Sequence, residues 1–326
     1  MSSQFIKNFT KISKKDIKIA GGKGASLGEM SKVGLPVPPG FVIIAKAFDY
    51  FLEKDDIYID IEAQLEKVNY DDTNTIDRYS NVVRDIIADT PVPAELVKEI
   101  LEEFKKLGSK FVAVRSSATA EDSESASWAG ELETYLNTTE KTLLANVKKC
   151  WSSLFTPRAI FYRKEKDLHK TEVSVAVVVQ EMVESEISGI CFTVHPVTQD
   201  KEQMIIEAGW GLGEAVVSGS ITPDSYVIEK IKNQKSKIKI IDEFEILDIN
   251  ISEQKKQLVR CFKKGVKWIT VPKNRQEAQK LSGDKIIELA KICASIEKHY
   301  RKPQDIEWAY KNNKFYITQS RPITTL

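Results

Sequence analysis

Apolar residues recur every three or four positions along several stretches of this chain. Residues 48–108 carry many charges between such positions, and this spacing predicts amphipathic helices rather than strands. Shorter helices are expected between Gly24 and Gly34 and around residues 143–154. Residues 284–300 also repeat at helical spacing. The apolar positions expected to face the core there are Ile287, Ala290, Ile292 and Ile296.

Between the predicted helices lie short apolar runs of strand length. They cover residues 41–44, 111–115, 173–179, 204–207 and 226–229. Residues 238–281 are rich in lysine and only weakly patterned. This mixture of helices and strands predicts an α/β or α+β fold.

The segment from Asp305 to Pro322 predicts two strands joined by a polar turn. In the first strand, Asp305, Glu307 and Ala309 alternate with the apolar Ile306, Trp308 and Tyr310. In the second strand, the alternation places Phe315, Ile317, Gln319 and Arg321 on one face.

The turn between these strands decides the register. A three-residue turn at residues 312–314 places Glu307 opposite Gln319, and Asp305 opposite Arg321. A two-residue turn places Glu307 and Gln319 on opposite faces. In the first register Glu307 and Gln319 present oxygen ligands suited to Mg²⁺, with Arg321 beside them for a phosphate. The alternative is an ordinary hairpin with a polar outer face.

Gly21-Gly-Lys-Gly places Lys23 at a sharp turn just before a helix, where backbone N–H groups and the helix dipole favour an anion. The spacing does not fit a Walker A loop. A solvated lysine is the alternative. Arg115 ends an apolar strand. Its guanidinium is expected either to clamp two phosphate oxygens or to pair with the carboxylate of Glu121 or Asp122.

The segment Gly209-Trp-Gly-Leu-Gly-Glu follows a strand, as a dinucleotide-binding loop does. The fingerprint fails, because its third glycine is replaced by Glu214. A tight turn is the alternative interpretation.

Charge and cysteine content narrow the class of protein. The chain has 326 residues, with 48 Lys and Arg against 47 Asp and Glu. This balance disfavours binding to nucleic acid or to an anionic membrane. Four separated cysteines without a nearby histidine predict free thiols rather than a zinc site. No apolar run has the length of a signal peptide core or a membrane span, so we expect a cytoplasmic protein.

Four separated motifs, in order, resemble the nucleotide-binding part of the phosphoenolpyruvate synthase family, which includes pyruvate phosphate dikinase and rifampicin phosphotransferase. The resemblance runs from about Asp16 to Pro322. The motifs are Gly21-Gly-Lys-Gly-Ala-Ser-Leu-Gly-Glu-Met, Ala113-Val-Arg-Ser-Ser-Ala-Thr-Ala-Glu-Asp, Gly209-Trp-Gly-Leu-Gly-Glu and Asp305-Ile-Glu-Trp-Ala with Gln319-Ser-Arg-Pro.

The resemblance implies a two-lobed ATP-grasp fold that holds ATP between residues 1–180 and residues 181–326. It makes Lys23, Arg115 and Arg321 catalytic ligands of the transferred phosphate, and Glu307 and Gln319 ligands of Mg²⁺. The residues implied to contact the adenosine are Gln180, Glu181, Met182 and Val183, with Glu184 or Glu186 at the ribose. Residues 116–130 would close over the phosphates, and residues 209–214 would form a structural loop beside the nucleotide.

None of the three histidines lies in the Ser-His setting of the family's phosphorylated histidine, and no pyruvate-binding barrel is recognisable. The resemblance therefore implies phosphate transfer from MgATP to a histidine on a separate domain or chain, as in a pyruvate, water dikinase, and a chain that is incomplete by itself. The alternatives are the equivalent domain of a rifampicin-type antibiotic phosphotransferase and a nucleotide-binding module without transfer activity.

Overall fold

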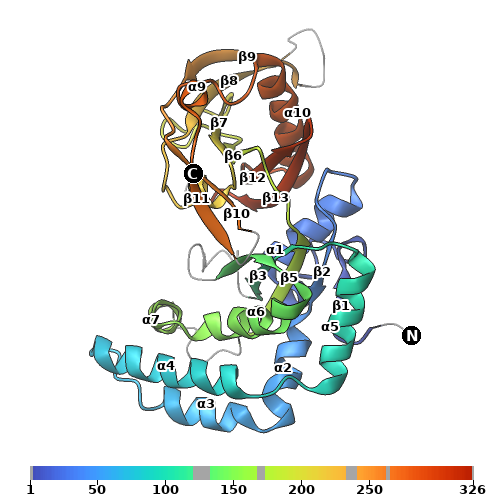
Figure 1. The fold of residues 1–326 in the computed structure, drawn as a ribbon, viewed down its shortest axis with the longest axis vertical. Helices are drawn as coiled ribbons and strands as arrows, with labels where there is room; N and C mark the ends of the chain where they lie inside the picture. The colour runs from blue at the N-terminus through green and yellow to red at the C-terminus, as the bar shows by residue number, and fades with distance from the viewer. Residues whose placement is uncertain (1–2, 120–132, 167–172, 233–240, 262–264, 325–326) are drawn as a thin grey trace. The chain divides into compact units, whose positions relative to one another are not determined.

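The computed structural model describes residues 3–119, 133–166, 173–232, 241–261 and 265–324. The chain divides into two compact units (Figure 1). Unit 1 consists of Met1–Val33 and Pro39–Met182, and unit 2 consists of Gly34–Pro38 and Val183–Leu326. The predicted mixed class is confirmed, and the pairings within the main sheets of both units are antiparallel.

Unit 1 is built on a five-stranded sheet of order β1-β2-β5-β3-β4. Its strands are β1 (Ile6–Asn8), β2 (Gly40–Ile43), β3 (Val112–Ala118), β4 (Thr134–Thr138) and β5 (Val175–Glu181). Its helices are α1 (Ile17–Lys32), α2 (Ala45–Lys54), α3 (Ile57–Leu65), α4 (Thr73–Asp89), α5 (Ala94–Leu107), α6 (Glu140–Ser152) and α7 (Pro157–Glu165), with short 3-10 turns at Phe9–Lys11 and Ser153–Phe155.

Alternation along β5 separates two buried faces. Val175, Val177 and Val179 point into a core shared with α2, α5 and α6. The other face carries Val178 and Gln180, and α1 packs against β3 and β5. Both faces of the sheet are therefore covered, and the face against α1 includes a buried polar residue, Gln180.

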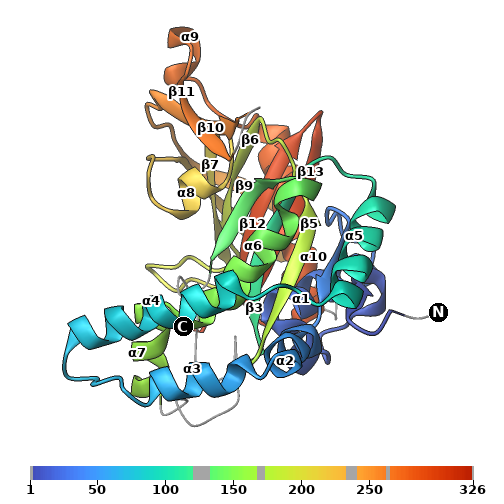
Figure 2. The ribbon, with the colours of Figure 1, turned by 60° about the horizontal axis from the view of Figure 1, so that its bottom comes forward.

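Unit 2 is built on a six-stranded sheet of order β13-β12-β6-β7-β8-β9. Its strands are β6 (Ile187–Phe192), β7 (Gln203–Trp210), β8 (Asp224–Lys232), β9 (Ile241–Asn250), β12 (Gln304–Lys311) and β13 (Lys314–Pro322). The other elements of the unit are α8 (Glu214–Val217), the hairpin β10 (Lys256–Arg260) with β11 (Val266–Thr270), α9 (Lys273–Gln276) and α10 (Gly283–Tyr300). Figure 2 shows this hairpin with α8 and α9 beside it.

Helix α10 contacts β7, β9 and β12 of this sheet. The predicted helix exists, but the predicted buried positions Ile287 and Ile292 are only half-buried. The positions that are buried are Ile286, Leu289, Ala290, Cys293 and Ile296. Ala290 and Ile296 are thus buried as predicted, whereas Ile287 and Ile292 each lie one residue from a buried position of the helical stripe.

The charged region from residue 48 to 108 forms the helices α2 to α5, as predicted. The weakly patterned region contains β9, β10, β11 and α9, which the pattern did not reveal. All four cysteines are free thiols, and Cys150, Cys191 and Cys293 are buried. Within the described ranges, no helix is both long and apolar enough to cross a membrane.

Candidate functional site

A kink in α1 presents Lys23. Gly21 has φ 68° and ψ 174°, so the helix is interrupted there and continues after the kink through Lys23. Gly21 must be a glycine, because a Cβ at this position would lie 2.3 Å from the carbonyl oxygen of Ser117. The chain therefore turns sharply beside Lys23, as the Gly-Gly-Lys-Gly sequence predicted.

Arg115 lies on β3 and is 8% exposed. It shares a face of β3 with Ser117, two residues further along the strand. The Ser117 hydroxyl accepts a hydrogen bond from the backbone N–H of Gly24, at 3.2 Å. This hydrogen bond joins α1 to β3 beside the two predicted phosphate ligands, Lys23 and Arg115. Both ligands belong to unit 1.

The predicted adenine-binding stretch covers the end of β5. Gln180 is 2% exposed, and its Nε2 has no hydrogen-bond partner in the part of the chain that the structure describes. The N–H groups of Glu181 and Met182 donate to the carbonyls of Pro39 and Phe111, at 2.8 and 3.1 Å. These two N–H groups are therefore already used, whereas a carbonyl retains a second lone pair for another partner.

Two glutamates were candidates for the ribose. The Glu184 carboxylate pairs with Arg260 at 3.2 Å and lies 3.9 Å from the Lys311 ammonium. Glu186 is exposed, and its Oε1 accepts a hydrogen bond from the N–H of Asn312. Both side chains thus contact other parts of unit 2.

The hairpin of β12 and β13 has the register that brings the predicted metal ligands together. Glu307 lies opposite Gln319, and Asp305 lies opposite Arg321. The turn itself has two residues, because Lys311 pairs with Lys314. Asn312 and Asn313 both have positive φ, as a type I′ turn requires.

A β-bulge reconciles a two-residue turn with this register. Trp308 pairs with Ile317, but Glu307 pairs with Gln319, so Thr318 is an extra residue. Phe315 and Ile317 are buried with Trp308, whereas Gln319 and Arg321 lie on the Glu307 face. The prediction that all four second-strand residues share one face was wrong, because alternation along the strand changes phase at the bulge.

Charged side chains gather on this face of the sheet. Arg321 donates from Nε and Nη2 to Oδ2 of Asp305, at 2.8 and 2.7 Å. Gln319, Glu307, Ile190 and Glu207 are successive register partners across β13, β12, β6 and β7. A glutamate therefore lies on each side of Ile190 in the register, and the Arg321 guanidinium contacts the nearby Asp305.

Burial governs how the carboxyl groups ionise. It raises the pKa of Asp305, and the adjacent Arg321 guanidinium opposes that rise. Burial also raises the pKa of Glu207, and the charge of Asp305 adds to the rise. The protonated forms of both carboxyl groups are therefore favoured more than they are in water.

The donor set of the hairpin fits Mg²⁺. Glu307 and Gln319 supply a carboxylate and an amide oxygen from adjacent strands, which suits an ion that also takes oxygens from water and phosphate. Among the described residues, no group of three or more His, Cys, Asp or Glu side chains is arranged to hold a metal ion. A bound Mg²⁺ would therefore depend on such additional oxygens.

The Gly209–Glu214 segment is a tight turn held by its own unit. Gly211 has φ 92°, and its carbonyl accepts the hydroxyls of Ser185 and Ser188, at 2.8 and 2.6 Å. Gln254 accepts the N–H of Trp210 and donates to its carbonyl. These contacts fit a rigid loop rather than a dinucleotide cradle.

Sequence reasoning overlooked Ser117 and Glu207. A glutamate within the apolar run of residues 204–207 was the available signal for Glu207, whereas a serine among five in residues 116–130 gave none for Ser117. The predicted closing segment is described only through residue 119, and residues 120–130 lie outside the described residues.

His195 forms a local turn, since its Nδ1 accepts the N–H groups of Val197 and Thr198.

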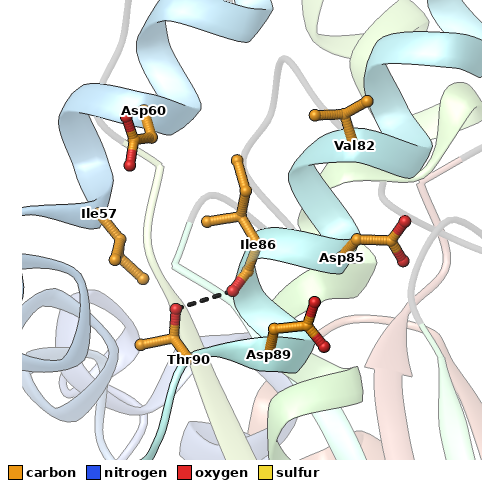
Figure 3. A pocket seen from close by; sticks show the side chains of 7 residues that line it. All are labelled: Ile57, Asp60, Val82, Asp85, Ile86, Asp89 and Thr90. Atoms are coloured by element: carbon orange, nitrogen blue, oxygen red, sulfur yellow. Dashed lines mark hydrogen bonds between the residues drawn. The ribbon is translucent and has the colours of Figure 1, made fainter.

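A separate pocket of about 510 Å³ lies between α3 and α4 in unit 1 (Figure 3). Ile57, Val82 and Ile86 contribute apolar side chains, and three aspartates lie around them. None of the predicted ligands of ATP or Mg²⁺ lines it. The acidic lining does not suit the phosphates of a nucleotide.

Comparisons with known proteins agree with the sequence motifs. The family described as "Pyruvate phosphate dikinase, AMP/ATP-binding domain" matches residues 17–326. A probable phosphoenolpyruvate synthase from Methanocaldococcus jannaschii is 45% identical over 100% of this chain and 27% of its own length. The corresponding protein from Archaeoglobus fulgidus is 46% identical over 97% of this chain and 41% of its own length.

Rifampicin phosphotransferase from Bacillus subtilis is 36% identical over 99% of this chain and 36% of its own length. The chain thus spans less than half the length of these relatives. Among solved structures, D-alanyl-alanine synthetase A from Vibrio cholerae is 11% identical, covers 75% of this chain and 54% of its own, and has a TM-score of 0.28, too low to bear on the fold. The match over residues 17–326 decides the matter: the chain belongs to the family of the pyruvate phosphate dikinase AMP/ATP-binding domain.

Proposed function

We propose that this chain is the ATP-binding part of a phosphoenolpyruvate synthase-like phosphotransferase. It would bind MgATP through residues of both predicted ATP-grasp lobes, 1–180 and 181–326, and donate phosphate to a histidine on a separate domain or chain. The observation that carries the proposal is the bulge at Thr318, which places Gln319 beside Glu307. Bulges commonly re-aim side chains next to active sites.

Each unit supplies one set of ligands. In unit 1, Lys23 and Arg115 would contact the transferred phosphate, where their charges offset negative charge. In unit 2, Glu307 and Gln319 would hold Mg²⁺, and Arg321 would add a third positive contact, held by Asp305. When bound, Mg²⁺ supplies further charge neutralisation and fixes the phosphate oxygens.

The end of β5 would contact the adenine. Because the N–H groups of Glu181 and Met182 are used within unit 1, we assign the donor role to the Val183 N–H and the acceptor role to the Glu181 carbonyl. Gln180 would contribute its buried amide. The ribose role expected of Glu186 would require its contact with the Asn312 N–H to open or to be shared.

Single-turnover transfer tests this function. Labelled MgATP is mixed with the chain and with the histidine-containing remainder of a phosphoenolpyruvate synthase. We expect Lys23→Ala and Arg115→Ala each to slow transfer by about 10² to 10³, and to weaken ATP binding less. Lys18→Ala, an exposed lysine before the kink of α1, is the matched control.

Two outcomes would contradict this function. Normal transfer rates in both variants would show that Lys23 and Arg115 do not contact the transferred phosphate. Absence of ATP binding by the unmodified chain would overturn the proposal.

The second candidate function is the ATP-binding part of a rifampicin-type phosphotransferase, as the 36% identity to the enzyme from Bacillus subtilis suggests. Phosphate transfer to the remaining domains of that enzyme, but not to those of the synthase, would favour this second function.

A further inference from the structure

The kink of α1 contains an inserted hydroxyl group. In a regular helix the N–H of Gly24 would donate to the carbonyl of Ala20, four residues earlier. Here the Ser117 hydroxyl stands between them. It donates to the Ala20 carbonyl at 3.0 Å and accepts the Gly24 N–H at 3.2 Å.

This arrangement replaces one broken helical hydrogen bond by two bonds through a side chain. Insertion of a side chain into the helical ladder is a recognised cause of a kink. Ser117 is fully buried, so water does not compete for either bond. Gly21 allows the close approach, because a Cβ there would lie 2.1 Å from Ser117 Oγ.

The same hydroxyl lies on the strand that carries Arg115. Ser117 and Arg115 are two residues apart on β3 and share its face, while Lys23 lies between Gly21 and Gly24 in the kinked segment. We infer that Ser117 is a positioning residue that fixes Lys23 relative to Arg115, so that both point to one phosphate group. This inference rests on the proposed function.

The chemistry explains why the residue is a serine. A hydroxyl both donates and accepts, whereas alanine does neither and a thiol does both only weakly. In Ser117→Ala the Gly24 N–H and the Ala20 carbonyl either lose their partners or bond directly to each other. The direct bond would straighten α1 and move Lys23 away from its position.

The test compares ATP with AMP, which lacks the terminal phosphates. Calorimetric titrations in Mg²⁺ give both dissociation constants for the unmodified chain, Ser117→Ala and Ser117→Cys. We expect both variants to lose affinity for ATP on the order of tenfold, with little change for AMP. Ser80→Ala is the matched control, because Ser80 is also fully buried and donates to a distant backbone carbonyl, that of Phe155.

The ratio of the two affinities separates positioning from stability. A variant that merely unfolds more readily loses ATP and AMP binding alike, as Ser80→Ala would if it is destabilised. An unchanged ratio in a folded Ser117→Ala or Ser117→Cys protein would overturn the inference. Failure of the unmodified chain to prefer ATP over AMP would instead overturn the proposed function.

Discussion

At the scale of single residues, the carboxyl group of Glu207 is expected to lower the free energy of unfolding near neutral pH. Its pKa is raised by burial and by the charge of Asp305. A folded-state pKa above the unfolded value means that the folded protein holds the proton more tightly. Stability is therefore lost as the pH rises from the unfolded pKa through the folded one.

We predict that Glu207→Gln is more stable than the unmodified protein at pH 7. The gain should be below about 1 kcal/mol, because the carboxylate keeps some solvent. It should vanish below about pH 4, where both states bind the proton. Urea unfolding across this pH range measures it, with Glu229→Gln on β8 as control. A loss of stability at pH 7 would show that a cation such as Arg321 already compensates the charge.

At the scale of the elements, the β12–β13 hairpin depends on two residues in left-handed conformation. Asn312 and Asn313 have φ of 49° and 61°. Asparagine tolerates this region better than most residues, and glycine tolerates it best. The turn is closed by Lys311 opposite Lys314, an unfavourable pair, so the two asparagines carry much of its specification.

We predict that Asn313→Val is less stable than Asn313→Gly by roughly 1–2 kcal/mol. Both variants lose the hydrogen bond from the Tyr310 hydroxyl to the Asn313 side chain, so their difference isolates the backbone term. Urea unfolding measures it, and ATP titration in Mg²⁺ reports whether the Glu307–Gln319 register survives. Equal stability of the two variants would contradict a type I′ turn at this position.

The hairpin also shows what the sequence can predict. Alternation correctly placed Glu307 away from the core and identified both strands, and the family motifs singled out Gln319. The turn length remained open, because Asn312-Asn313-Lys314 accommodates either turn. The bulge at Thr318 could not be predicted, since nothing local distinguishes it from its neighbours in the strand. Its effect is to change the face of every later residue in β13.

Elsewhere in the chain too, features set by local sequence were predicted, and features set by contacts between distant residues were not. The charged region that forms α2 to α5 was predicted from its period alone, whereas β10 and β11 carry mostly polar or exposed residues and were missed. The kink of α1 was partly foreseen from Gly21. Its cause, the hydroxyl of Ser117, comes from a strand almost a hundred residues later, where no local pattern reveals it.

At the scale of the whole molecule, each unit has its own buried interior, and that of unit 2 contains an ion pair. Asp224 on β8 and Lys280 before α10 are both fully buried, with 2.7 Å between Oδ1 and Nζ. The Asp224 carboxylate also accepts from the Tyr226 hydroxyl and from the N–H of Ser252. This network joins β8, the β9–β10 connection and the start of α10.

We predict that Lys280→Met destabilises unit 2 by roughly 3–5 kcal/mol, because Asp224 would remain buried without its cation. Hydrogen exchange should accelerate in β7, β8 and α10 but not in β3 and β5 of unit 1. The double variant Asp224→Asn with Lys280→Met should lose less stability than Lys280→Met alone, since neither charge is left unpaired. Faster exchange in β3 and β5 to the same extent would instead show that the two units unfold as one cooperative structure, whatever the division of their cores.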